Sequence, residues 1–132
     1  VNNTSVVPSR INLKFVLKCF DIMKIGEVFV PKLYSFKITD LARILSPKTK
    51  HKFVGIRPGE KLDEFLCSVE ENHNILEFKS HYIIFKDLTD KKKFKRICKN
   101  KGKEVSRDFY YSSKNNLQFL NLQQIKKKFS KF

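Results

Sequence analysis

Short runs of β-branched and aromatic residues alternate with segments of helical period along this chain, and this alternation limits its fold most. The strand-like runs are EVFV, HKFVGI and HYIIFKD, at residues 27–30, 51–56 and 81–87, and DFYYSSKNN at 108–116 indicates a strand that runs into a polar turn. Apolar residues recur with helical period at residues 12–24, 37–45, 60–66, 90–102 and 121–129, the last with Asn121 as its cap. The pattern predicts an α/β chain. Because its strands are few and widely spaced, we expect further polypeptide to complete their sheet.

Length and composition set the broad class. The chain has 132 residues, of which 41% are hydrophobic, so we expect one domain at most with a real core. It has no apolar run of about 18 residues, and its N-terminus lacks the pattern of a secretory signal, so we expect no membrane association. Cys19, Cys67 and Cys98 never pair as C-x-x-C, which fits reduced thiols in a cytoplasm and predicts no zinc site.

The net charge of +15 is typical of nucleic-acid-binding proteins, but its distribution argues against that function. Residues 86–132 carry 15 basic and 4 acidic side chains, whereas residues 1–85 carry 13 and 9. Of the 28 basic residues 23 are lysine, and arginine is better suited to reading phosphates and bases. No helix-turn-helix, zinc finger or aromatic RNA-binding pattern occurs. We interpret residues 90–102 as a solvated helix with one apolar stripe and do not expect nucleic-acid binding.

The stretch GIRPGEK at residues 55–61 has the composition of a nucleotide-binding turn. Arg57 offers a planar fork of donors that matches phosphate oxygens. Pro58 and Gly59 make a tight corner, and the carboxylate of Glu60 is able to accept from two neighbouring hydroxyls, such as those of a ribose. The alternative is an exposed turn with a weak Arg57–Glu60 ion pair. From these four residues alone, the ion pair is the favoured interpretation.

The wider setting of this turn resembles a known family. The segments are GEVFVPKLYSFKITDLA, GIRPGEKLDEFL, LEF, HYII and a tail with YSS and an asparagine before FL, in order from about residue 12 to 126. They resemble the C-terminal part of the inverting UDP-N-acetylglucosamine 4,6-dehydratases, in the polysaccharide-biosynthesis branch of the extended short-chain dehydrogenases. Tyr34, Phe36 and Asp63 depart from the family pattern, and the first dozen residues do not match it.

The resemblance implies both a fold and a site. The fold is the substrate-binding C-terminal portion of an extended short-chain dehydrogenase, a Rossmann-type α/β fold without its dinucleotide-binding half. The complete enzyme uses NADP to oxidise the sugar at C4, eliminates water across C5 and C6, and returns hydride to C6. The product serves surface polysaccharide or flagellin glycans. By the same resemblance Arg57 and Glu60 contact UDP, and Lys32, after the FVPK strand, is a weaker substrate-proximal candidate.

Other parts of the enzyme are missing from this sequence. Its four glycines cannot form a dinucleotide-binding loop, so we expect neither NADP binding nor catalytic residues here. Tyr110 and Lys114 have the Y-x-x-x-K spacing of a short-chain dehydrogenase pair. They lie among serines and asparagines that favour turns, so we predict no helix there and no catalytic pair.

The sequence is therefore interpreted as one partial domain, residues 1–132, with a poorly matched leader at 1–11 and a basic C-terminal extension at 86–132. The expected ligand is UDP-N-acetylglucosamine or a related UDP-sugar, and the chain is expected to be inactive alone. The expected protein partners are a separately encoded dinucleotide-binding half and, in the complete enzyme, further copies of itself. Two alternatives stay open: a non-catalytic basic module that binds nucleic acid or polyanions, and an interaction remnant of a split enzyme.

Overall fold

The computed structural model describes residues 4–7, 13–24, 26–52, 54–99 and 101–129. The chain divides into two compact units. Unit 1 comprises Val1–Pro8, Leu33–Glu64 and Ser112–Phe132, and unit 2 comprises Ser9–Lys32 and Phe65–Tyr111. Each unit is built from segments that are distant in the sequence, so neither corresponds to one continuous stretch of chain.

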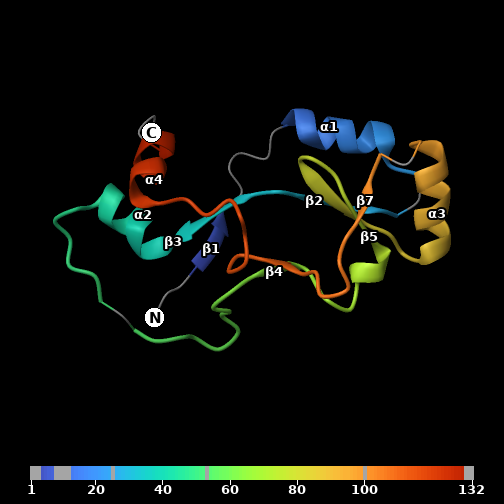
Figure 1. The fold of residues 1–132 in the computed structure, drawn as a ribbon. Coiled ribbons are helices and arrows are strands. Elements are labelled where there is room, and N and C mark those ends of the chain that lie inside the picture. The colour runs from blue at the N-terminus through green and yellow to red at the C-terminus, as the bar shows by residue number, and fades with distance from the viewer. Residues whose placement is uncertain (1–3, 8–12, 25, 53, 100, 130–132) are drawn as a thin grey trace. The chain divides into compact units, whose positions relative to one another are not determined.

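Unit 2 contains a four-stranded sheet in the order β2-β6-β5-β7. Its strands are β2 (Val28–Pro31), β5 (Ile75–Glu77), β6 (His81–Ile84) and β7 (Lys103–Glu104). All neighbouring strands in it pair antiparallel. The helices of this unit are α1 (Leu13–Ile22), α3 (Leu88–Ile97) and the short 3-10 helix η1 (Asn72–Asn74). In Figure 1, α1 and α3 lie beside this sheet, with the C-terminal end of α3 next to the end of α1.

Both faces of this sheet are packed. Phe29, Ile83 and Leu76 are cross-strand neighbours on one face, where Phe94 of α3 covers them. Val30, Tyr82 and Ile75 belong to the other core cluster, which includes Cys67 and Tyr111. Burial of two faces explains why the β5 and β6 sequences are almost continuously apolar.

Unit 1 pairs β1 (Thr4–Val7) antiparallel with β3 (Tyr34–Lys37) and carries α2 (Ile38–Leu45) and α4 (Leu122–Phe129). Its core consists of Phe36, Leu120 and Ile125, against which Leu41, Ile44 and Phe129 pack. The start of α4 is a reciprocal cap, because Asn121 Oδ1 accepts from Gln124 N and Gln124 Oε1 accepts from Asn121 N, both at 2.9 Å. A further two-stranded sheet is formed by β4 (Phe65–Cys67) and β8 (Tyr111–Ser112).

The prediction of a mixed α/β chain is confirmed, and four of the five predicted helices are found, as α1, α2, α3 and α4. Two local predictions are wrong. Of residues 51–56 those that the structure describes have no strand, and residues 60–66 form no helix but lead into β4. In the described part of the chain, none of the helices has the length and apolarity to cross a membrane.

Candidate functional site

Residues 55–60, which we call the arginine turn, lie in unit 1 and contain a type II β-turn at Arg57–Glu60. Glu60 N donates to Arg57 O at 3.0 Å, closing the turn across Pro58 and Gly59. Gly59 has a φ of 85°, which a type II turn requires at its third position, and proline is favoured at the second. Gly55 also has a φ of 85°. The order Arg-Pro-Gly-Glu thus dictates this local geometry, as the sequence predicts.

Glu60 contacts Arg57, as predicted, but its two carboxylate oxygens make different contacts. Glu60 Oε2 accepts from the backbone N of Arg57 at 3.0 Å, so this oxygen is used to hold the turn. Glu60 Oε1 lies 4.0 Å from Arg57 Nε. The side chains are 76% and 50% exposed. This is a weak ion pair, and the terminal nitrogens of Arg57 have no hydrogen-bond partner among the residues that the structure describes.

The end of this loop is fixed by the C-terminal tail of the same unit. Ser113 is fully buried. Its backbone N donates to Glu64 O at 2.9 Å, and its hydroxyl accepts from Glu64 N at 3.1 Å and donates to Asp63 Oδ1 at 3.3 Å. These three bonds tie residues 63 and 64, three and four positions after Glu60, to the tail.

The tail is itself fixed to β3 by buried polar groups. Asn116 Nδ2 donates to Leu33 O at 2.6 Å and to Ser35 Oγ at 2.9 Å, and Asn116 Oδ1 accepts from Gln118 N at 2.9 Å. Ser35 N in turn donates to Gln118 O at 3.1 Å. Hydrogen bonds therefore connect β3 to the tail, and the tail to residues 63 and 64, which follow the arginine turn.

The YSS and asparagine of this tail belong to the family-like pattern, but the sequence did not predict a role for them. The signal was present, because four of the five residues of SSKNN are serine or asparagine, which favour side-chain bonds to the backbone over helix. The partner segment, 49 or 50 residues away, was not deducible.

Lys32, the weaker candidate, lies in unit 2 and is already engaged there. Its Nζ donates to Glu77 Oε1 at 2.6 Å and lies 4.9 Å from the centre of the Tyr82 ring. The side chain is only 17% exposed. Burial, with a smaller contribution from Glu77, raises the pKa of Tyr82 to about 12, so this phenol stays protonated beside the ammonium.

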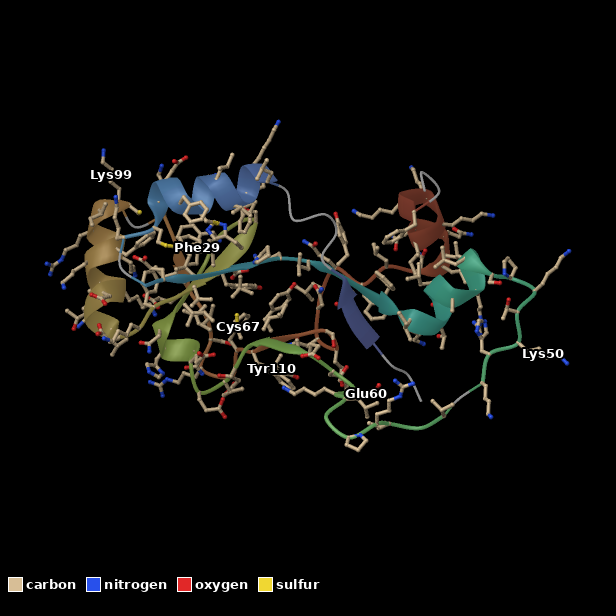
Figure 2. All side chains as sticks on the ribbon, turned by 180° about the vertical axis from the view of Figure 1, so that it is seen from behind. Phe29, Lys50, Glu60, Cys67, Lys99 and Tyr110 are labelled. Atoms are coloured by element: carbon tan, nitrogen blue, oxygen red, sulfur yellow. The ribbon has the colours of Figure 1, made fainter. Side chains whose placement is uncertain are left out.

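The long loop between α2 and β4 carries the arginine turn away from regular structure. Figure 2 shows Lys50 and Glu60 on this loop, with no helix around either of them. The loop also exposes three apolar side chains, Val54, Ile56 and Leu62. The arginine turn alone therefore offers a surface-exposed set of donors and acceptors rather than an enclosed pocket.

As predicted, Tyr110 and Lys114, which have the Y-x-x-x-K spacing, do not lie on a helix. Tyr111 and Ser112 form β8 instead, and Ser112 N donates to Asn115 Oδ1 at 2.8 Å in the turn that follows. Among the residues that the structure describes, no three His, Cys, Asp or Glu side chains gather as a metal site would require.

Comparison with known proteins places these features in context. The sequence profile of the family described as "Polysaccharide biosynthesis protein" matches residues 10–86. An inverting UDP-N-acetylglucosamine 4,6-dehydratase of Campylobacter jejuni is 44% identical over 108 residues, which cover 79% of this chain and 32% of that protein. A UDP-glucose 4-epimerase of Rickettsia canadensis is 31% identical over 119 residues, covering 87% of this chain and 34% of the epimerase.

The fold has a counterpart among solved structures. The structure of Pen from Bacillus thuringiensis matches with a TM-score of 0.65 and 22% sequence identity, covering 84% of this chain and 32% of Pen. The chain spans about one third of the length of these relatives.

Proposed function

Because this chain belongs to the polysaccharide biosynthesis protein family, we propose that it is the substrate-binding, C-terminal segment of a UDP-N-acetylglucosamine 4,6-dehydratase. The observation that carries the proposal is the arginine turn, in which the side chain of Arg57 is 76% exposed on a backbone fixed by Pro58 and Gly59. In this proposal the Arg57 fork binds a phosphate of UDP.

Only one of the two carboxylate oxygens of Glu60 is left for a ligand. Because Oε2 is held by Arg57 N, the oxygen left for a ligand is Oε1. We propose that Oε1 accepts from a ribose hydroxyl and exchanges its weak contact with Arg57 Nε for that bond. The weak ion pair between Arg57 and Glu60 is then the state of the arginine turn before UDP binds.

The two relatives support UDP as the recognised group. Both names contain UDP, but the sugar attached to it and the reaction differ. A segment that resembles both is therefore best assigned to the part that their ligands share. Lys32 is a secondary candidate in this proposal, and it would have to share its ammonium with Glu77.

The rest of the proposed enzyme is supplied from outside these 132 residues. The four glycines provide no dinucleotide loop, so we propose that NADP and the catalytic residues belong to a separate dinucleotide-binding half with a Rossmann-type fold. The chain alone is then inactive. We propose a cytoplasmic location for the assembled enzyme, which makes a 4-keto-6-deoxy sugar nucleotide for surface glycans.

An NMR titration of the chain with UDP tests the proposal. We expect amide shifts in residues 55–64 that are lost in Arg57→Ala. Lys50→Ala is the matched control, because it removes one exposed positive charge from the same loop and should leave the shifts unchanged. Equal shifts in Arg57→Ala and in the unmodified chain, or shifts confined to other residues, would contradict the assignment of the arginine turn.

A further inference from the structure

Unit 2 contains a cavity of about 460 Å³ that none of the residues assigned to UDP lines. It lies on the sheet face covered by α1 and α3, and its apolar lining includes Phe78, Ile83 and Phe94. A volume of this size is typical of small-molecule sites. Nothing in the proposed function uses it.

The charge of this cavity is of one sign. Lys18 of α1 and Lys99 and Lys101, which follow α3, line it, and none of its described lining residues is acidic. No described residue forms an ion pair with these three lysines. By contrast, Lys91 and Lys95 of α3 both pair with Glu104, whose Oε1 lies 2.8 Å from Lys95 Nζ. The three lysines at the cavity therefore lack the carboxylate partner that Lys91 and Lys95 share.

The cavity wall also contains a buried histidine with an unused nitrogen. His81 is 7% exposed, and its ring stacks on Phe78 with centroids 4.9 Å apart. Its Nδ1 lies 3.1 Å from Ser80 Oγ, whereas Nε2 has no hydrogen-bond partner in the part of the chain that the structure describes. Buried polar atoms in native proteins normally have a partner, so a group without one points to a missing ligand or water.

The backbone at the rim adopts an uncommon conformation at Lys99. Lys99 has a φ of 50°, the left-handed conformation that glycine commonly supplies just after a helix. It follows directly on the end of α3, where Cys98 N donates to Phe94 O at 2.9 Å. Figure 2 shows Lys99 at this end of α3. A lysine in this position adds charge to the rim at a conformational cost that glycine would avoid.

We propose that this cavity binds a small organic anion, a carboxylate or phosphate monoester carried on an apolar ring or short chain. The apolar body packs against Phe78 and Phe94, and the anionic group lies among Lys18, Lys99 and Lys101. Binding requires both the lysines and the apolar lining of the cavity, which distinguishes this site from a surface that attracts any anion. The proposal does not depend on UDP binding.

Binding at this site is coupled to His81. Burial, and then the charges of Lys18 and Lys32, lower the pKa of His81, so the free protein holds a neutral imidazole. Lys99 and Lys101 are the other charged groups that line the cavity. A bound anion favours the imidazolium and raises the pKa of His81, so affinity increases as the pH falls through the pKa of the complex.

The test is an NMR titration of the whole chain with phenyl phosphate and phenylacetate. Benzyl alcohol supplies the ring without the charge, and inorganic phosphate supplies the charge without the ring. We expect both aromatic anions to shift the amides of residues 18–22 and 94–99, and both controls to bind at least about tenfold more weakly. Lys18→Gln and Lys101→Gln each weaken binding by about threefold. Lys92→Gln, an equal charge change at an exposed position of α3 that does not line the cavity, leaves it unchanged.

The His81 ring signals provide a second readout with phenylacetate, whose own charge is constant near neutral pH. We expect a higher pKa of His81 when the site is saturated. Benzyl alcohol binding as tightly as phenylacetate, an equal loss in Lys92→Gln, or an unchanged pKa of His81 at saturation would each overturn the proposal, as would no shifts at all. The three lysine variants alter exposed side chains, so a folded spectrum is expected in each.

Discussion

The sheet of unit 2 and the loop of residues 46–64 in unit 1 are held in place by different kinds of interaction. In the sheet, Ile75, Leu76 and Ile83 are fully buried, and apolar side chains cover both faces. In the loop, Val54 and Ile56 are exposed, and the end of the loop is fixed by three hydrogen bonds to Ser113. The sheet depends on burial spread over many residues, and the loop on a few directional contacts.

Because of this difference, the residues that contribute most to stability are not those of the arginine turn, which we propose to bind UDP. Burial is non-directional and scales with area, so the sheet contributes most of the free energy of folding of its unit. Hydrogen bonds contribute less each, but they fix positions. The candidate UDP contacts therefore lie where a single change is able to move a ligand group without unfolding the chain.

The largest expected effect comes from the centre of the sheet. Ile83→Ala removes a fully buried side chain from β6 that packs with Phe29 and Leu76. We expect the free energy of unfolding to fall by about 3 kcal/mol, because both burial and packing are lost. Urea denaturation followed by circular dichroism measures it. Val28→Ala on the adjacent edge strand is the control, since Val28 is mostly exposed, and an equal loss there would contradict the sheet's assigned role.

A smaller effect is expected from the bonds that fix the loop. Ser113→Ala removes the hydroxyl bonds to Glu64 N and Asp63 Oδ1 and leaves the Ser113 N to Glu64 O bond intact. We expect a loss of about 1 kcal/mol, because the Glu64 amide loses its partner in a partly buried hydrogen bond. Amide exchange should accelerate around residues 60–64. Ser106→Ala, at an exposed serine, is the control, and unchanged exchange in Ser113→Ala would show that the tail does not hold the loop.

The ion pair of Lys32 lies between these two cases, being partly buried and directional. Glu77→Gln breaks the 2.6 Å contact between the two side chains, and we expect a loss of about 1 kcal/mol because Glu77 is 37% exposed. The pKa of Tyr82 should fall below about 12, because the carboxylate that opposes its ionisation is gone, but burial keeps it raised. Carbon NMR of the Tyr82 ring measures this. Glu70→Gln at an exposed position is the control, and a rise in the pKa of Tyr82 would contradict the assigned cause.

The sequence predicted the elements that local pattern determines. Apolar period and capping marked α1, α2, α3 and α4, and the cap at Asn121 is confirmed. The Arg-Pro-Gly-Glu turn was likewise predictable, because proline and glycine fix its backbone angles.

The failures lie between residues 51 and 66, where distant partners decide the structure. Phe65 and Leu66 fit a helical period, yet they belong to β4, which pairs with β8 some 45 residues later. Local propensity is a weak prior against such pairing. Two residues that depart from the family pattern, Asp63 and Phe36, also have partners in the structure. Asp63 accepts from Ser113, and Phe36 is in the core of unit 1 with Phe129, 5.7 Å between ring centroids.

The smallest effect on stability, and the sharpest separation of the two regions, is expected at Arg57. Its 4.0 Å contact with Glu60 joins two exposed side chains, so Arg57→Ala should change the free energy of unfolding by less than about 0.5 kcal/mol. The turn itself survives, because Glu60 N still donates to the carbonyl of residue 57 and Glu60 Oε2 still accepts from its amide. If Arg57 binds a phosphate, the same substitution removes the UDP-induced shifts. Urea denaturation and the UDP titration on one sample therefore measure two independent quantities. A loss of stability comparable to that of Ser113→Ala would make Arg57 a structural residue, and the exposed guanidinium would no longer be evidence for a ligand.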